Sequence, residues 1–416
     1  MKEKIEIKNF AGIGHWEIEL NAINIWIGPQ ASGKSITAKL FYFFKSVFDT
    51  ISSDYPKKSY EVILTEKFCT YFPISTWGNE DFYIKYTLDS FILEIRRTKE
   101  TKPLSMTFSK EFETAFKLYK DLVQNSPQKF EMEGYKASRW IHWDFNLAFI
   151  YELKERYGNL IGASQLFIPA GRSFFSNIQS NIFTFLKTDQ GFDPFLLEFG
   201  ASYESIKKMT YLRKRTWGKG KYNDKLDKLL GDVLHGNHVM KKDGEEYLVH
   251  DQGKRIVHVN FASSGQQEAL PLALFLRLAL DRRLHSTETI VYIEEPEAHL
   301  FPQSQKSVVE ALAIIANASS TPYQFIITTH SPYILASFNN LIEAGNVIKE
   351  NPEKKEEVFK IVDESLILKY EDINAYSLTG GHCEKIMDDE MRLISPTILD
   401  KVSDDISVQF GDLLDL

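Results

Sequence analysis

The segment that most constrains this chain is Gly28-Pro29-Gln30-Ala31-Ser32-Gly33-Lys34-Ser35, which fits the pattern GxxxxGK[ST]. An alternating polar and apolar run, residues 16–27, leads into it, and residues 36–48 follow with apolar and aromatic side chains at helical spacing. A strand, a glycine-rich loop and a helix in this order predict a phosphate-binding loop within an α/β fold.

Composition narrows the class of protein. The chain has 416 residues, of which 43% are hydrophobic and 25% charged, so it is expected to be globular rather than disordered or fibrous. Its net charge of −8 means that nucleic acid could bind only at a local basic patch. Two cysteines cannot form a disulfide framework or a multi-cysteine zinc site. The N-terminus lacks a signal-peptide core, and the longest apolar run, residues 269–280, is interrupted by Arg277 and too short for a membrane span, so we expect a cytoplasmic protein.

Strand and helix patterns divide the chain into four segments. Residues 82–108 alternate as an antiparallel meander, residues 110–157 have a helical pattern broken near Ser126-Pro127, and short strands are predicted at 166–172 and 256–261. We expect a nucleotide-binding lobe at 1–172, a helical and basic insertion at 173–255, a second lobe at 256–350 and a C-terminal segment with an acidic end at 351–416.

The phosphate loop predicts particular chemistry. Its glycines let backbone N–H groups turn toward phosphate oxygens, and the helix that follows adds the positive end of its dipole. Lys34 is expected to reach the β- and γ-phosphates, and the Ser35 hydroxyl to coordinate Mg²⁺. A nucleotide carrying β- and γ-phosphates, together with Mg²⁺, is therefore the predicted ligand.

Two adjacent acids, Glu294 and Glu295, end a predicted buried strand. Neighbouring side chains on a regular strand point to opposite faces, so one carboxylate can face the metal while the other positions the attacking water. The alternative is a solvated strand end without a catalytic role.

Two further groups have both functional and structural interpretations. Ser263, Ser264, Gly265 and Gln266 precede an apolar helix, where they can form a second phosphate-binding surface or simply cap the helix. His330 follows a buried strand, where it can contact a γ-phosphate or serve as a structural histidine.

Taken in order, GPQASGKS, SSGQQ, IEEPEAHL and TTHS resemble the Walker A, signature, Walker B and switch-histidine motifs of ABC-type ATPase heads. The chain is most similar to the OLD and RecF-like branch, the AAA15/AAA21 group, in which EEPEAHLFP and THSP recur; LFIPAGR resembles its PAxR element. The resemblance implies a head with a mixed central sheet, a flanking antiparallel sheet and a helical lobe.

The resemblance also implies how the motifs act. Two heads are expected to hold ATP between them, with the signature residues Ser263 to Gln266 of one copy acting on the nucleotide of the other. Glu294 would support Mg²⁺, Glu295 would be the general base and His330 would sense the γ-phosphate. Residues with looser assignments are Asn9 and Phe10, near the adenine, and Gln165 and Arg172, as Q-loop or phosphate contacts. Glu294 replaces a common aspartate and Gln266 a common glycine, and these departures imply slow turnover.

Three functions remain open at this stage. The first is an ATPase subunit that scaffolds a separately encoded effector, a nuclease or toxin, similar to ATPase subunits of the anti-phage systems Septu and PARIS. The second is a RecF-like DNA-repair clamp, and the third is an ATP-dependent scaffold with little turnover. The long span between the phosphate loop and the signature disfavours a transporter, and residues 110–250 lack the heptads of chromosome-maintenance arms. The residues after His330 contain no strand-borne acidic cluster, so we expect no nuclease site in this sequence.

The clamp hypothesis depends on residues 207–228, which hold nine Lys or Arg and two Asp with three interleaved aromatic side chains. Such a segment can neutralise phosphates and stack on bases, or it can be a solvated hairpin or the seat of an acidic partner. The candidate patch consists of Lys207, Lys208, Arg213, Lys214, Arg215, Lys219 and Lys221.

Overall fold

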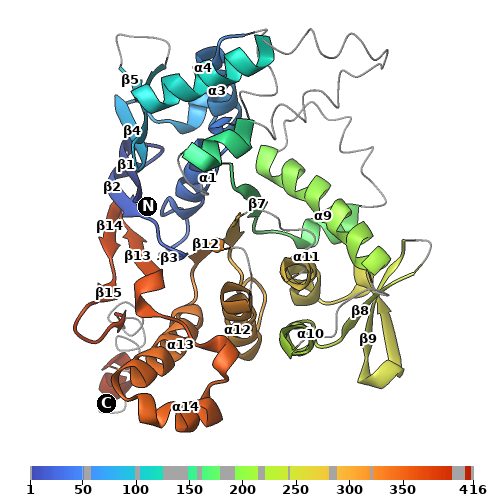
Figure 1. Cartoon of the computed structure of the whole chain (residues 1–416). Coiled ribbons are helices and arrows are strands. Elements are labelled where there is room, and N and C mark those ends of the chain that lie inside the picture. The colour runs from blue at the N-terminus through green and yellow to red at the C-terminus, as the bar shows by residue number, and fades with distance from the viewer. Residues whose placement is uncertain are drawn as a thin grey trace.

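A six-stranded mixed sheet forms the centre of the computed structural model (Figure 1). The structure describes residues 2–48, 50, 58–98, 104–124, 149–156, 162–178, 193–213, 221–241, 244–280, 288–318, 322–395 and 408–413. The strand order is β14-β13-β3-β12-β11-β7, and every pairing is parallel except that of β13 with β14. These strands are β3 (Ile23–Ile27), β7 (Ser164–Ile168), β11 (Thr289–Glu294), β12 (Tyr323–Thr329), β13 (Ile373–Thr379) and β14 (His382–Lys385).

Burial explains why these sequences form central strands. Every residue of β3, β11 and β12 is buried, as expected for parallel strands that are covered on both faces. The sheet draws its strands from the first, third and fourth of the expected segments. The C-terminal segment thus contributes β13, which pairs directly with β3, the strand that leads into the phosphate loop.

A five-stranded antiparallel sheet, β2-β1-β4-β5-β6, flanks the centre and confirms the predicted meander. Its strands are β1 (Glu3–Phe10), β2 (Ile13–Glu19), β4 (Phe82–Leu88), β5 (Phe91–Arg97) and β6 (Ser105–Phe108). Buried and partly exposed residues alternate along β4, so one face of this sheet packs on the core. The helices beside it in Figure 1 are α1 (Lys34–Lys45), α3 (Tyr60–Tyr71) and α4 (Lys110–Gln124).

The other described elements form two mainly helical lobes (Figure 1). One lobe combines α7, α9, α10 and α11 with the small sheet β10-β9-β8, and a second contains α12, α13 and α14. Their bounds are α7 (Ser173–Ile178), α9 (Pro194–Arg213), α10 (Lys221–Leu234), β8 (Asn237–Met240), β9 (Glu246–His250), β10 (Arg255–His258), α11 (Ser264–Ala279), α12 (Pro302–Ala318), α13 (Pro332–Glu350), α14 (Lys355–Ile361), β15 (Met387–Asp388) and β16 (Leu393–Ile394). No described helix has the length and apolar character required to cross a membrane.

The central sheet separates two hydrophobic clusters. Trp26 of β3 points into the cluster shared with the antiparallel sheet, whereas Ile25 and Ile27 point into the cluster shared with α10 to α13. Burial of both faces contributes most of the stability of such a sheet, at about 25 cal/mol per Å² of apolar surface. The strand before the phosphate loop is therefore held from both sides.

Some predicted boundaries move in the structure. The strand expected at 166–172 occupies 164–168 and stops before Pro169. The strand expected at 256–261 is shorter, because Val259–Phe261 form a 3₁₀ turn ahead of α11. Within the helical pattern of 110–157, α4 ends at Gln124, residues 149–156 are helical, and 125–148 lie outside the described residues.

Candidate functional site

The phosphate loop, residues 28–35, joins the end of β3 to the start of α1. Gly33 is the N-cap of α1 in a left-handed conformation with φ of 94°, and no side chain caps the helix. Glycine suits this position because other residues adopt positive φ only at a cost. The uncapped first turn presents backbone N–H groups together with the positive end of the helix dipole, which is a binding surface for an anion.

Two distant elements hold the loop in shape. A Cβ atom on Gly28 would lie 2.0 Å from the carbonyl oxygen of Leu378 in β13. A Cβ atom on Gly33 would lie 2.6 Å from the indole of Trp16 in β2. The Trp16 indole N–H in turn donates a hydrogen bond of 2.9 Å to the carbonyl of Gly381. Both glycines are therefore required by close packing.

The Lys34 side chain folds across the loop. Its ammonium donates hydrogen bonds of 2.8 Å to the carbonyl oxygens of Gly28 and Pro29. Burial lowers the pKa of Lys34, and the carboxylates of Glu295, Glu297 and Glu294 partly offset that effect. The ammonium thus lies inside the loop, facing the acidic end of β11.

Glu294 ends β11 and is 7% exposed. Its Oε2 accepts a 3.2 Å hydrogen bond from the Ala170 N–H, whereas its Oε1 is buried without a hydrogen-bond partner among the described residues. Burial raises the pKa of this carboxyl. Hydrogen bonding by the Ser35 hydroxyl is the largest effect that lowers the pKa again. A buried carboxylate oxygen with no partner, next to a hydroxyl, is a donor set that fits Mg²⁺.

Glu295 lies just beyond the end of β11. The prediction that regular strand alternation points the two acids to opposite faces therefore does not apply to it. Its φ of 43° is left-handed, and its N–H donates 2.9 Å to the Thr328 carbonyl, so the backbone turns at this residue. The Glu295 Oε1 lies 3.3 Å from Nε2 of His330. A carboxylate and an imidazole thus meet at the carboxyl edge of the parallel strands, where ligands bind in open α/β sheets.

Glu297 is a site residue that the sequence reasoning missed. Its Oε1 accepts a 2.6 Å hydrogen bond from the backbone N–H of His330, and its Oε2 is buried without a partner among the described residues. The side chain fixes the backbone from which the imidazole projects. The signal was present in the motif EEPE, whose third acid follows the pair by two residues.

The turn Ser263 to Gln266 is a capping box, which is the structural interpretation left open above. The Gln266 N–H donates 3.3 Å to the Ser263 hydroxyl, and the Ser263 N–H donates 3.1 Å to the Gln266 side chain. Gln266 also donates 2.8 Å to the Leu234 carbonyl, so its amide is committed within the chain. Ser263 and Ser264 nevertheless remain exposed. A Cβ atom on Gly265 would lie 2.6 Å from the carbonyl oxygen of His299.

Other predicted contacts have different surroundings. Phe10 is fully buried among Phe68, Phe72 and Phe82, so its ring is unavailable to an adenine, while Asn9 is exposed with φ of 54°.

Both Q-loop candidates make side-chain contacts within the chain. Gln165 accepts a 2.9 Å hydrogen bond from the Tyr292 hydroxyl. Arg172 is fully buried and bonded to protein carbonyls, which excludes it as a phosphate contact in this conformation.

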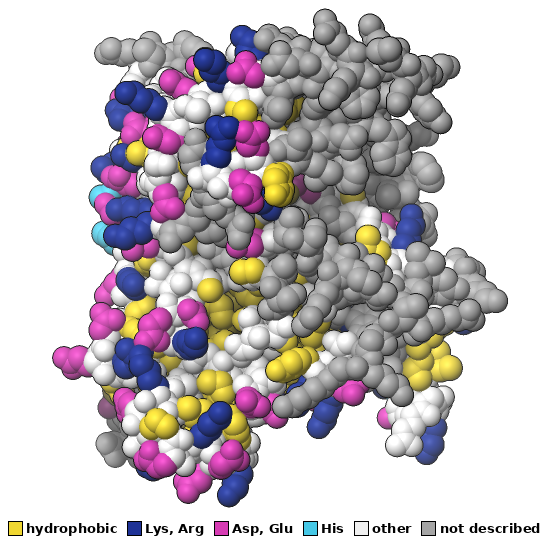
Figure 2. Space-filling view, viewed as in Figure 1, with side chains coloured by type: hydrophobic (Ala, Val, Ile, Leu, Met, Phe, Trp, Pro, Cys, Tyr) yellow, Lys and Arg dark blue, Asp and Glu magenta, His cyan; other side chains and the backbone are white. Residues whose placement is uncertain are grey.

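The basic patch is only partly described. Lys207 is 3% exposed and pairs with Glu204 at 2.7 Å and Glu246 at 3.2 Å, so its assignment to a nucleic-acid surface is wrong. Lys208 is exposed. The side chains of Arg213, Lys214, Arg215, Lys219 and Lys221 lie outside the described part. On the described part of the face in Figure 2, basic side chains are interspersed with acidic ones.

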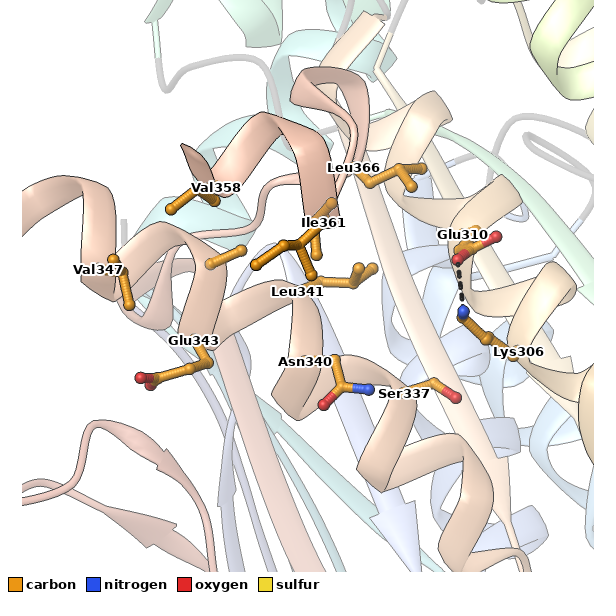
Figure 3. A pocket seen from close by; sticks show the side chains of 12 residues that line it. Lys306, Glu310, Ser337, Asn340, Leu341, Glu343, Val347, Val358, Ile361 and Leu366 are labelled. Atoms are coloured by element: carbon orange, nitrogen blue, oxygen red, sulfur yellow. Dashed lines mark ion pairs between the residues drawn. The ribbon is translucent and has the colours of Figure 1, made fainter. Parts of the chain in front are cut away.

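A separate apolar groove of about 430 Å³ lies between α12, α13 and α14 (Figure 3). Leu341, Val358 and Ile361 line it, and Lys306 and Glu310 form an ion pair of 3.6 Å at its side. None of the residues that line it belongs to the phosphate loop or to the acidic end of β11. It is therefore distinct from the site at the edge of the central sheet.

Residues 170–335 match the AAA15 family, described as an AAA ATPase domain. This stretch is therefore similar to an AAA ATPase domain. It contains the capping-box turn, both acids of β11 and His330, whereas the phosphate loop precedes it. No curated protein matches the chain.

Solved structures similar to this chain include three heads of SMC proteins. A SmcHead bound to the C-winged helix domain of ScpA has 14% identity and a TM-score of 0.39, covering 92% of this chain and 96% of that one. The SMC head domain from Thermotoga maritima has 11% identity and a TM-score of 0.37, covering 92% and 98%. The third is the Smc head domain with an extended coiled coil from Pyrococcus furiosus, bound to the C-terminal domain of ScpA. It has 12% identity and a TM-score of 0.37, covering 98% of this chain and 99% of that one.

Proposed function

We propose that the chain binds ATP with Mg²⁺ at the phosphate loop and hydrolyses it slowly, as one of a pair of ABC-type heads. The observation that carries the proposal is Oε1 of Glu294, which is buried near Ser35 at the end of β11 and has no hydrogen-bond partner among the described residues. A buried carboxylate oxygen left unpaired costs free energy unless a cation or donor compensates it. The loop supplies the complementary surface for phosphates.

The side chains present can divide the chemistry of hydrolysis. Ser35 and Glu294 would hold the cation, which when bound neutralises charge on the β- and γ-phosphates. Lys34 would exchange its contacts with loop carbonyls for phosphate oxygens. Glu295 is the group proposed to accept hydrogen bonds from the attacking water, with His330 at 3.3 Å orienting the carboxylate.

A second copy is the proposed source of the groups that complete the site. The two hydroxyls at the start of α11, Ser263 and Ser264, are exposed although their turn is part of a capping box. Phe261 precedes this turn and is 84% exposed. Phe301 follows His299, whose carbonyl lies against Gly265, and is 75% exposed. Exposed aromatic side chains beside exposed helix-start hydroxyls favour an interface at this face.

For the biological role, we propose that head association regulates a separately encoded effector in an anti-phage defence complex. The resemblance of the motifs to the OLD and RecF-like branch supports this role, which requires that the effector bind the ATP-bound and ADP-bound states with different affinity. The clamp hypothesis is weakened by Lys207, which is buried and paired.

The test compares Glu295→Gln with the wild type in ATP binding, phosphate release and sedimentation. We expect Glu295→Gln to bind ATP normally, release phosphate about 100-fold more slowly and accumulate as a dimer with ATP. Lys34→Ala should lose nucleotide binding. Glu384→Gln removes an exposed charge elsewhere and should match the wild type. Equal phosphate release from Glu295→Gln and the wild type would leave the scaffold without turnover as the better account.

A further inference from the structure

Arg172 lies between β7 and α7, and its side chain is 1% exposed. Nη1 donates hydrogen bonds of 3.0 Å to the carbonyl of Pro169 and 2.7 Å to that of Glu294, and Nη2 donates 3.0 Å to that of Glu295. One guanidinium therefore holds the backbone from which both acids of the candidate site project. Every one of these contacts is to a carbonyl oxygen, so Arg172 occupies neither the carboxylate of Glu294 nor that of Glu295.

The opposite edge of the same guanidinium is bound to α11. Nε donates 2.9 Å to the carbonyl of Glu268 and lies 3.3 Å from its Oε1. The Glu268 carboxylate also accepts hydrogen bonds of 2.8 Å from the backbone N–H groups of Arg172 and Ser173. Glu268 is one helical turn after Ser264, so a movement of the start of α11 carries Glu268 with it.

The backbone of Glu295 has a conformation that depends on its contacts, including the one with Arg172. Its left-handed φ of 43° is an uncommon conformation for a residue other than glycine and persists only where the surroundings enforce it. Three hydrogen bonds hold it: the Glu295 carbonyl accepts 3.0 Å bonds from Arg172 and from the Ala298 N–H, and the Glu295 N–H donates to the Thr328 carbonyl. Loosening the contact with Arg172 would let Glu295 turn away from its present position beside His330.

We propose that Arg172 is a positioning residue that couples the exposed start of α11 to the carboxylate of Glu295 in the same chain. Contact of a second copy with Ser264 shifts α11, and the pair of Glu268 and Arg172 passes that shift to the backbone of Glu295. Hydrolysis in each head then depends on whether its own α11 engages the other head's nucleotide. This inference rests on the proposed function, because it concerns the regulation of the same site.

The test is a double-mutant cycle on ATP turnover with Arg172→Lys and Ser264→Ala. Arg172→Lys keeps the charge but cannot reach all of the carbonyls at once, so we expect kcat to fall about 10- to 100-fold while KM changes less than about threefold. In the Ser264→Ala background the same substitution should lower kcat less than about threefold. The contact of the second copy with the Ser264 hydroxyl, which would move α11, is already lost in that background. Lys207→Arg is the matched control, a conservative exchange of another buried, paired cation, and should preserve kcat.

Distinct outcomes separate the failures. Unchanged kcat in Arg172→Lys, or equal fold-losses in both backgrounds, overturns the coupling and leaves the ATPase assignment intact. A wild type that neither binds nor hydrolyses ATP overturns the proposed function, and the coupling with it. If Arg172→Lys melts without cooperativity, Glu268→Gln applies the same cycle from the other end of the pair and is expected to show the same non-additive loss.

Discussion

Replacing Gly265 by alanine tests the contact between the two turns that flank the candidate site. Gly265 is the second residue of α11, where alanine would ordinarily gain up to about 1 kcal/mol from helix propensity. In this fold the new methyl would lie 2.6 Å from the His299 carbonyl oxygen, a backbone atom that must retreat by about 0.5–1 Å to restore normal contact. Forced overpacking of this kind costs about 1–3 kcal/mol.

Gly231 in α10 is the matched control. A Cβ there meets nothing nearer than the Asn237 side chain at 3.9 Å, so Gly231→Ala should gain the helix-propensity term without a clash. In urea melts, the two variants should therefore differ in free energy of unfolding by about 1–3 kcal/mol, with Gly265→Ala the less stable. ATP turnover should also fall in Gly265→Ala, because His299 is four residues beyond Glu295. Equal stabilisation of both variants would show that the two turns do not pack as described.

Three further outcomes are expected. Ser263→Ala removes the capping box and should lower the free energy of unfolding by about 1 kcal/mol, measured by urea melts; an unchanged midpoint would contradict the capping geometry. Burial raises the pKa of the Cys383 thiol to about 12. Alkylation of Cys383 at pH 8 should therefore be about 1,000-fold slower than that of a free thiol, and its rate should rise tenfold per pH unit. A rate that levels off near pH 9 would refute the shift. The Lys349 ammonium, with Arg392, lowers the pKa of Glu371 to about 2, so the stabilising effect of the ionised Glu371 is present above pH 4.5 and lost toward pH 2. Glu371→Gln should therefore make the free energy of unfolding less sensitive to acid. An unaltered pH profile of the melts would refute the pairing of Glu371 with Lys349.

Local patterns explain the parts of the fold that the sequence predicted. The phosphate loop, the buried strand that ends at Glu294 and the antiparallel meander are each defined by neighbours within a few residues. The same holds for Lys207 in retrospect: Phe199, Tyr203, Lys207 and Thr210 recur at helical spacing, and all are buried. Counting charges without that periodicity made Lys207 look like a surface residue.

Contacts between remote segments could not be predicted in this way. The pair of Arg172 and Glu268 joins residues 96 positions apart, and the bond from Trp16 to Gly381 spans 365. Glu295 shows a second limit, because alternation along a strand ceases to apply where a residue adopts a left-handed backbone. The roles of such residues follow from three-dimensional packing, for which a single sequence offers no spacing rule.

The pairing of β13 with β3 has a practical consequence for anyone who shortens this protein. A fragment cut at residue 335, where the family match ends, would lack Ile373–Thr379 and leave one whole side of the phosphate-loop strand without its ladder partner. Unprotected strand edges of that kind recruit other chains and aggregate. Expression of the region that holds the candidate site should therefore keep the polypeptide through Ile394, the fully buried last residue of β16.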